Sequence, residues 1–214
     1  MPTDHFRILI CLLWLFVVAG GLSGMVKYEG SAGKVGETPR HWPPAARTTL
    51  ADDRATLLMF AHPKCPCTRA SLEELNRLLT HCRGEVIPHV LFFTPENAPR
   101  DWTHTDLRQS AEAIPGVIVE EDPDGKQAQR FGAETSGYVV VYDAHGELLF
   151  KGGITAGRGH AGDNAGANAI VSLLSVRSAL TRQAPVFGCT LLNPNGAGKN
   201  VASLCTRQYP KHIP

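Results

Sequence analysis

The sequence lacks a marked excess of charge of either sign. Its 21 lysine and arginine residues nearly balance 20 aspartate and glutamate residues, which gives a formal net charge of +1. A chain without a strong basic excess gives no general reason to expect a nucleic-acid partner, and we predict none. No acidic residue follows Asp163, but the basic residues beyond it are scattered and are therefore typical of a solvated face: Arg177, Arg182, Lys199, Arg207 and Lys211.

Cysteine is also scarce. Six cysteines in 214 residues are too few for a disulfide-dense scaffold, although they are enough for one or two redox or structural pairs. Cys65 and Cys67 are closely spaced, but no second pair with metal-ligand spacing exists, which argues against a zinc site. No internal repeat is evident, and the length suits one domain of about 100 to 150 residues with appendages.

One long uncharged apolar run extends from Ile8 to Val26. Its nineteen residues are near the lower limit for crossing a hydrocarbon core of about 30 Å. Small residues at Ala19 and Gly20 leave a cleaved signal peptide open as an alternative. The apolar character resumes beyond them without a clear cleavage site, which favours an uncleaved anchor. We therefore expect a single-pass protein of the inner membrane.

The orientation of this segment is ambiguous by charge alone. Arg7 precedes it, whereas Lys27, Lys34 and Arg40 follow it, and this count would place the following domain on the cytoplasmic side. A short tail before a first apolar segment nevertheless resembles an export signal, and paired cysteines suit an oxidising compartment. We therefore predict that the domain faces the periplasm or the cell exterior.

The composition divides the chain into five parts. Glycine and proline without a helical or strand period indicate a linker after the anchor, and a stretch rich in proline, glycine and asparagine indicates a tail at the end. The predicted parts are a short N-terminal tail at 1–7, a membrane anchor or uncleaved signal at 8–26, a linker at 27–50, a folded domain at 51–183 and a cysteine-containing tail at 184–214.

Strand-like and helix-like segments alternate within the predicted domain. A four-residue Asp/Gly turn between the last two strand-like runs predicts an antiparallel hairpin. The alternation favours a layered α/β domain. The predicted strands are 55–60, 86–93, 116–119, 138–142 and 147–151, and the predicted helices are 71–82, 102–114, 126–131 and 165–180.

The two close cysteines lie where the first strand becomes the first long helix, in the stretch AHPKCPCTRAS. Pro66 is favoured at the first position of a helix, which places Cys65 at the N-cap. A thiolate there would face unpaired backbone N–H groups and the positive end of the helix dipole, with Lys64 and Arg69 adding positive charge. These effects lower a thiol pKa, and the thiolate is the form that attacks disulfides and binds soft metals.

A bond between these two cysteines would be strained. Residues two apart in a regular helix point away from each other, so closure requires Cys65 to lie outside the helix, as Pro66 permits. Strained disulfides are more oxidising and more easily reduced than structural ones. The motif therefore suits thiol–disulfide exchange better than a permanent structural disulfide.

On these residues the sequence resembles the thioredoxin-like superfamily over about 51–183. The motifs HPKCPCTRAS, GGITAGRGHAGDNAG and VFGC resemble, more narrowly, its bacterial membrane-anchored members of the RedB type. The resemblance implies a central mixed sheet flanked by helices, Cys65 as nucleophile, Cys67 as resolving partner, and protein thiols or disulfides as partners.

Two departures from the family pattern affect the expected site. Thr68 occupies the slot of the usual second cysteine, so that Cys67 falls one residue early. The loop that carries a cis-proline in the family matches Thr135, Ser136 and Gly137, with glycine in place of proline, so the resemblance makes this the substrate-facing loop.

Most of the other candidate residues have two interpretations each. Cys189 is either disulfide-bonded to Cys205 or a third thiol that returns to Cys65 and Cys67. His62 is either structural or tunes the nearby thiol. Cys82 is an ordinary buried cysteine in a helix. The glycine-rich loop at 152–163 is either flexible backbone before an Asp/Asn helix cap, or a docking or active-site loop through Arg158, His160 and Asp163.

Three functions follow in order of preference. The first is a membrane-tethered thiol–disulfide oxidoreductase that needs no cofactor. The second is a copper-binding or copper-delivery module, in which Cys65 and Cys67 with Cys189, His62 or His160 supply soft ligands. The third is a thiol peroxidase, which the position of Thr68 after the first cysteine disfavours.

Overall fold

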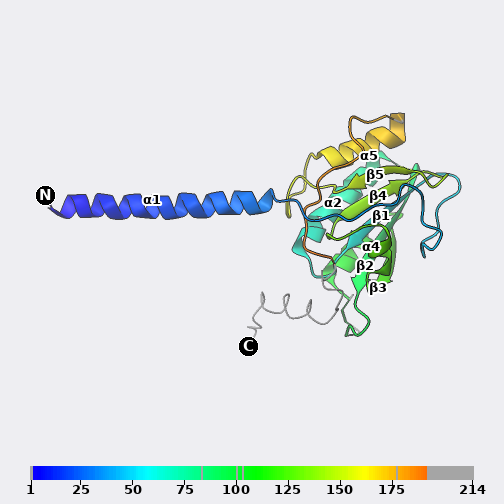
Figure 1. The fold of residues 1–214 in the computed structure, drawn as a ribbon, viewed down its shortest axis with the longest axis horizontal. Helices are drawn as coiled ribbons and strands as arrows, with labels where there is room; N and C mark the ends of the chain where they lie inside the picture. The colour runs from blue at the N-terminus through cyan, green and yellow to red at the C-terminus, as the bar shows by residue number, and fades with distance from the viewer. Residues whose placement is uncertain (1, 83, 100, 103, 177, 192–214) are drawn as a thin grey trace. The chain divides into compact units, whose positions relative to one another are not determined.

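In a computed structural model, residues 2–82, 84–99, 101–102, 104–176 and 178–191 are described. The chain forms two compact units, one up to Ser31 and one from Ala32 onward. The first unit is helix α1 (Pro2–Glu29), drawn in blue in Figure 1. Its stretch His5–Glu29 is long and apolar enough to cross a membrane, by length and composition.

The second unit is built on a mixed sheet of five strands in the order β3-β2-β1-β4-β5. Strands β1, β2 and β3 run parallel, whereas β4 is antiparallel to β1 and pairs with β5 as the predicted hairpin. This order and direction make the thioredoxin-like fold. The strands are β1 (Ala55–Ala61), β2 (Val86–Thr94), β3 (Ile118–Pro123), β4 (Tyr138–Tyr142) and β5 (Leu148–Gly152).

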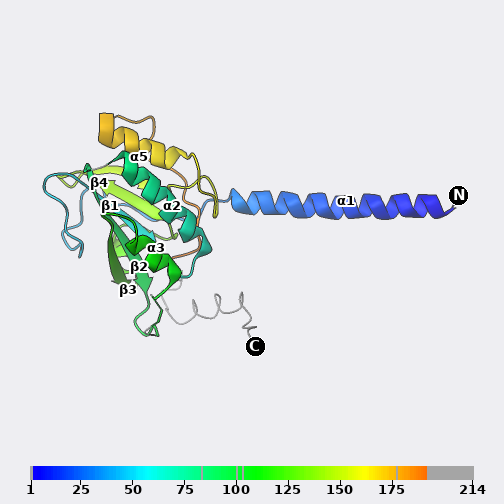
Figure 2. The same ribbon diagram turned by 180° about the vertical axis from the view of Figure 1, so that it is seen from behind.

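Helices flank the sheet because strand β1 is apolar on both faces and is buried along its whole length. Leu57 and Met59 contribute to a core shared with α2, α3 and α5, and Leu58 and Phe60 to a second core that includes Ala128 of α4. The views in Figures 1 and 2 show the helices around the sheet. The helices are α2 (Pro66–His81), α3 (Asp106–Glu112), α4 (Lys126–Arg130) and α5 (Ala165–Val176).

The segment that the sequence predicts as a linker over 27–50 is, from Ala32 onward, part of the second unit. Trp42 packs edge-on against Phe131 and Tyr142, with ring centroids 5.2 and 5.3 Å apart. The hydroxyl of Tyr142 also donates a 2.7 Å hydrogen bond to the carbonyl of Pro39. Helix α4 has only five residues, so this irregular segment supplies much of the second core's cover. Gly/Pro composition alone does not reveal such packing.

Several predicted elements differ from the structure in their bounds. The predicted helix 102–114 is only Asp106–Glu112, because Thr105 caps it by accepting a 3.3 Å hydrogen bond from the N–H of Arg108. Trp102 lies outside this helix and donates its indole N–H to the carbonyl of Phe93. The predicted strand 116–119 begins only at Ile118, after Gly116 with φ of 81°, and the last helix ends at Val176.

Candidate active site at the start of helix α2

Cys65 occupies the N-cap of α2, with Pro66 at the first helical position, as the sequence predicts. Its φ and ψ of −92° and 117° are extended, so its side chain leaves the helix rather than following the helical surface. Its N–H donates a 3.1 Å hydrogen bond to the carbonyl of His62, closing the turn after β1. Cys65 is 1% exposed, whereas Cys67, on the first turn, is half-buried.

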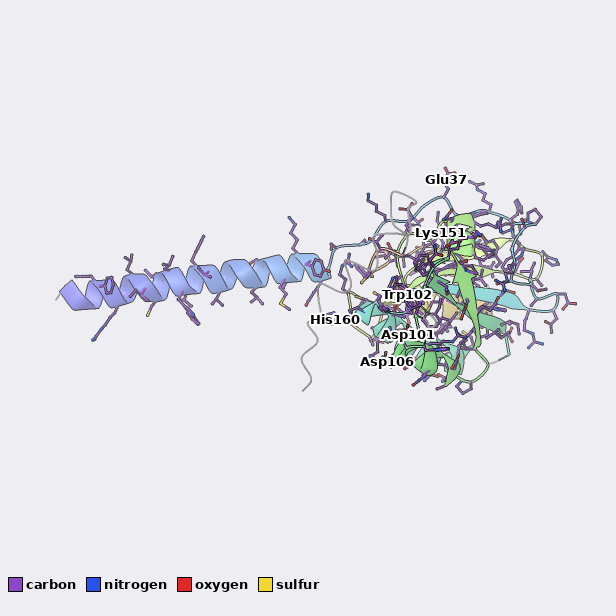
Figure 3. All side chains as sticks on the ribbon, turned by 90° about the horizontal axis from the view of Figure 1, so that it is seen from below. Glu37, Asp101, Trp102, Asp106, Lys151 and His160 are labelled. Carbon is purple, nitrogen blue, oxygen red and sulfur yellow. The ribbon has the colours of Figure 1, made fainter. Side chains whose placement is uncertain are left out.

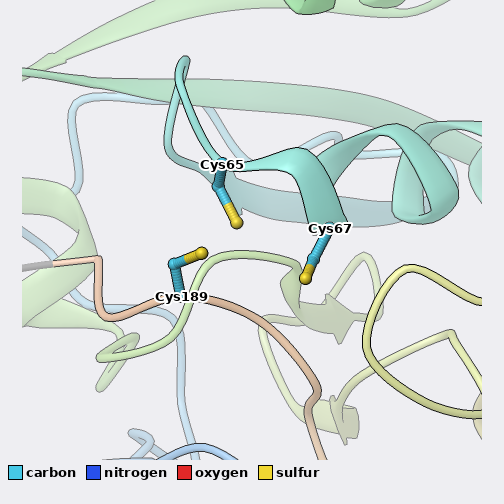
Figure 4. Close-up of side chains that lie close together, drawn as sticks. All are labelled: Cys65, Cys67 and Cys189. Carbon is cyan, nitrogen blue, oxygen red and sulfur yellow. The ribbon is translucent and has the colours of Figure 1, made fainter. Parts of the chain in front are cut away.

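A third cysteine completes this site. The sulfur atoms of Cys65, Cys67 and Cys189 all lie within 4.8 Å of one another. The side chains of Cys65 and Cys189 converge from opposite sides, and Cys67 reaches toward the same space from α2 (Figure 4). The tertiary structure therefore favours the interpretation of Cys189 as a third thiol. Its predicted partner in the alternative pairing, Cys205, lies outside the described residues.

Cys189 reaches the site on an extended piece of chain, 186–191, which we call the C-terminal segment. Thr190 forms an antiparallel bridge with Thr135. The N–H of Ser136 donates a 2.9 Å hydrogen bond to the carbonyl of Cys189, and the N–H of Leu191 donates a 2.8 Å bond to the carbonyl of Glu134. The loop expected to face substrate is thus already paired with the chain's own C-terminal segment.

Buried hydroxyl groups join β1, α2 and this loop. The N–H of His62 donates a 2.8 Å hydrogen bond to the hydroxyl of Ser136. The hydroxyl of Thr68 donates to the carbonyl of His62 at 3.3 Å and shares a 2.9 Å bond with Ser136. Thr68 is fully buried, so it positions the backbone around the cysteines.

Gly137 provides close packing at the position where the sequence resemblance leads us to expect a proline. Its φ is 87°, and its N–H donates a 2.8 Å hydrogen bond to the carbonyl of Phe60. A Cβ at this position would lie 2.7 Å from the hydroxyl of Ser71 on α2. Both the left-handed backbone and this contact favour glycine over a residue with a side chain.

The thiols polarise one another. Hydrogen bonding from the thiol of Cys189, and then from that of Cys67, lowers the pKa of Cys65 against the opposing effect of burial. The same interaction with Cys65 is the main cause that raises the pKa of Cys189. For Cys67, a hydrogen bond with Cys189 lowers the pKa, but Cys65 and burial together raise it. These hydrogen bonds favour Cys65 as the thiol of the three that loses its proton first.

The cations near the site differ from those expected. Lys64 places its Nζ 4.0 Å from the ring centroid of Trp102, and Arg69 pairs with Asp106 on α3. Neither is among the causes that lower the pKa of Cys65, which are hydrogen bonds from Cys189 and Cys67. Arg158 is the cation that acts here: its charge lowers the pKa of Cys67, and its Nη1 donates to the carbonyl of Gly188.

His62 is buried beside the cysteines, with 2% of its surface exposed. Its ring stacks on Phe93 and meets Trp102 edge-on, at centroid distances of 5.9 and 5.8 Å. Its Nδ1 accepts a 3.1 Å hydrogen bond from the N–H of Lys64, and burial lowers its pKa to about 4. His62 is thus a neutral packing residue near neutral pH, and its ring is not part of the sulfur cluster found among the described residues.

Of the three residues predicted in the glycine-rich loop, Arg158, His160 and Asp163, only Arg158 reaches the cysteine site. His160, labelled in Figure 3, is exposed, and its Nδ1 lies 2.8 Å from the carbonyl oxygen of Arg158. Asp163 is exposed as well, and its neighbour Asn164 caps α5 by accepting a 2.7 Å hydrogen bond from the N–H of Ala167. The prediction of an Asp/Asn cap is therefore met by Asn164.

Sequence reasoning missed Glu74, a buried carboxylate on α2 with 4% exposure. Its Oε1 accepts a 2.7 Å hydrogen bond from the N–H of Gly162 and pairs with Arg77, while its Oε2 accepts a 3.2 Å bond from Asn164. Glu74 therefore holds the loop that carries Arg158. The sequence pattern could have indicated this burial, because Glu74 lies between the apolar residues Leu72 and Leu75 of the buried helix face.

The other described cysteines lie elsewhere. Cys82 is buried in the first core, where burial raises its pKa to about 11. This is the ordinary buried cysteine that the sequence predicts, and a thiol with so high a pKa is a poor nucleophile. Cys11 is exposed on α1.

No known family model and no curated protein matches the chain. An uncharacterized conserved protein from Geobacillus kaustophilus is 17% identical, with a TM-score of 0.55 over 77% of this chain and 94% of that one. A hypothetical protein from Sinorhizobium meliloti 1021 is 20% identical, with a TM-score of 0.56 over 78% of this chain and 98% of that one. These likenesses show the fold alone.

A more distant match is the pneumococcal exposed lipoprotein thioredoxin from Streptococcus pneumoniae. It is 18% identical, with a TM-score of 0.40 over 58% of this chain and 86% of that one. A similarity this weak carries no argument about the chemistry of this chain.

Proposed function

We propose that the protein is a thiol–disulfide oxidoreductase whose nucleophile is Cys65. The observation that carries this proposal is the cluster of three sulfur atoms within 4.8 Å, one of them at a helix N-cap with a lowered pKa. A thiolate beside other thiols is the arrangement that disulfide exchange requires, because one sulfur attacks and another releases the product.

The first step is attack by the Cys65 thiolate on a disulfide of a partner protein. The bond between the two partner sulfurs breaks, a bond forms between Cys65 and one of them, and the other leaves as a thiolate that takes a proton from water. Attack by a second thiol of the site on Cys65 then releases the reduced partner and leaves this protein with an internal disulfide. Run backwards, the same steps oxidise a partner dithiol.

Replacement of Cys65 by serine tests this function. We expect Cys65→Ser to abolish exchange with a disulfide reagent, whereas Cys82→Ala, which removes a thiol of the core, leaves the exchange rate within about twofold. Rapid exchange by purified Cys65→Ser protein would refute the proposal.

The location proposed for this activity is the outer face of the inner membrane, with the domain in the periplasm or cell exterior and α1 as its anchor. The length and apolar composition of α1 support the anchor, and a redox-active thiol site suits an oxidising compartment. The RedB-type resemblance of the motifs around Cys65 and Cys189 agrees with this location. Labelling of single-cysteine variants by a membrane-impermeant maleimide in spheroplasts would test it, and protection until lysis would contradict it.

A second candidate function is the binding of Cu(I). Three cysteine sulfurs within 4.8 Å of one another form a soft donor set, which favours Cu(I) over harder ions once the thiols are deprotonated. The ion would be held by Cys65, Cys67 and Cys189, and the protein would deliver it from this site to a copper-accepting partner. Stoichiometric Cu(I) that survives competition with a Cu(I) chelator and requires each of the three cysteines would support this function. Failure to retain Cu(I) would exclude it.

A further inference from the structure

We propose that Cys189, and not Cys67, is the thiol that resolves the mixed disulfide on Cys65, so that the oxidised protein carries a disulfide between Cys65 and Cys189. This inference rests on the proposed function, because it names the second thiol of the same reaction. It also assigns a catalytic role to the C-terminal segment at 186–191, which lies beyond the predicted thioredoxin-like domain.

The first argument is the direction of the side chains. Cys65 lies outside the helix at the N-cap, and its side chain converges with that of Cys189 (Figure 4). Among the causes that lower the pKa of Cys65, hydrogen bonding by Cys189 is the largest. Cys189 comes from a separate segment, so its Cβ can approach Cys65 in the orientation that an unstrained disulfide needs.

The second argument is the constraint on Cys67. It sits on the first turn of α2, where the helix fixes the direction of its Cβ, and it is joined to Cys65 through Pro66 alone. A disulfide between these two cysteines would close a ring over one intervening residue and would be strained. Strain of this kind slows closure and disfavours the product relative to a bond between distant segments.

The third argument is that Cys189 is held firmly in place. The flanking residues Val186 and Leu191 are each 1% exposed and belong to the second core. Gly188 runs so close to the loop that a Cβ on it would lie 2.0 Å from the carbonyl oxygen of Ser136. The side chain of Arg158 also donates to the carbonyl of Gly188. A thiol presented on such a segment is aligned for attack and loses little freedom in the transition state.

The same packing sets the order of events. Cys65 is 1% exposed, so a partner disulfide reaches its sulfur only after a packed neighbour moves, and in this proposal the C-terminal segment opens transiently from its packed position. The return of the segment then brings Cys189 back to the mixed disulfide. In that step the Cys189 thiol loses its proton to water and attacks Cys65, the bond from Cys65 to the partner breaks, the Cys65–Cys189 bond forms, and the partner sulfur leaves as a thiolate that takes up a proton. The partner disulfide is the oxidant that receives both electrons.

The test uses the full-length chain in detergent, fully reduced and then mixed with oxidised glutathione. Samples are quenched with acid, alkylated and mapped by mass spectrometry over time. In the wild type and in Cys67→Ser we expect glutathione on Cys65 to give way to a Cys65–Cys189 bond. In Cys189→Ser we expect glutathione to stay on Cys65 at least about tenfold longer. Cys189→Ala serves as a second variant, and thermal unfolding shows that each variant is folded.

Two results would overturn the inference and leave the proposed function intact. One is a Cys65–Cys67 bond in the wild type, with Cys189→Ser and Cys189→Ala releasing glutathione from Cys65 as fast as the wild type. The other is a Cys189–Cys205 bond in oxidised protein whose Cys65 still exchanges. If Cys65 takes up no glutathione in any folded variant, the proposed function itself is wrong.

Discussion

The backbone N–H of Ser136 donates a hydrogen bond of 2.9 Å to the carbonyl oxygen of Cys189. This bond joins the loop before β4 to the C-terminal segment. The hydroxyl of the same serine contacts Thr68 on α2 and accepts from the N–H of His62 after β1. One residue thus ties together the chain segments that bring the cysteines to a common point, and the geometry of the thiol site depends on these contacts.

Gly188→Ala should separate the two steps of the reaction. The added methyl group would clash with the carbonyl oxygen of Ser136 and push the C-terminal segment away from Cys65. We expect uptake of glutathione by Cys65 to stay equal or become faster, and its release to slow by roughly tenfold. Gly159→Ala is the matched control, because a Cβ there meets nothing within 4 Å and introduces only a left-handed alanine with φ of 70°. Equal slowing in both variants would count against a specific role for the segment.

Glu74→Gln should loosen the loop that carries Arg158. The carboxylate accepts hydrogen bonds from Gly162 and Asn164 and pairs with Arg77, and a neutral amide cannot accept all of them. We expect a loss of unfolding free energy of about 1–3 kcal/mol, measured by urea denaturation. Glu73→Gln removes an exposed charge one residue away and should change stability by less than about 0.5 kcal/mol. Similar losses in the two variants would contradict the assigned role of Glu74.

His62 should make the fold sensitive to acid. Burial lowers its pKa from 6.5 to about 4, so the unfolded chain binds the proton more tightly than the folded protein does. The stability linked to this histidine is therefore complete above pH 6.5 and declines as the pH falls from 6.5 toward 4, by up to about 3 kcal/mol.

Denaturant unfolding between pH 7 and pH 4 measures this effect. We expect His62→Asn to lose stability overall but to show a shallower pH dependence in this range than the wild type. His81→Asn, which changes an exposed histidine on α2, should follow the wild-type pH dependence. A wild-type slope in His62→Asn would show that other groups cause the acid sensitivity.

Trp42→Ala tests whether residues 32–50 stabilise the domain. The indole packs against Phe131 and Tyr142 over the second core, so its removal should cost about 2–4 kcal/mol in unfolding free energy. Val35→Ala, at a side chain that is 40% exposed in the same segment, should cost under about 1 kcal/mol. A negligible cost for Trp42→Ala would restore the interpretation of this segment as a free linker.

The local pattern determined much of the fold. The apolar run 55–60 predicts strand β1, the spacing of Leu72, Leu75 and Leu78 predicts the buried face of α2, and Pro66 predicts its start with Cys65 at the N-cap. These features follow from backbone geometry and side-chain periodicity over a few residues, which any short sequence window contains.

Only the tertiary structure decided which thiols and charges meet. Cys189 reaches Cys65 because an extended segment pairs with Thr135, and Arg158 reaches Gly188 because Glu74 holds its loop. Lys64 and Arg69 lie close to Cys65 in sequence, but their charges are engaged by Trp102 and Asp106. Contacts between distant segments depend on how elements pack and on which backbone groups remain to be paired, and neither is encoded in local periodicity.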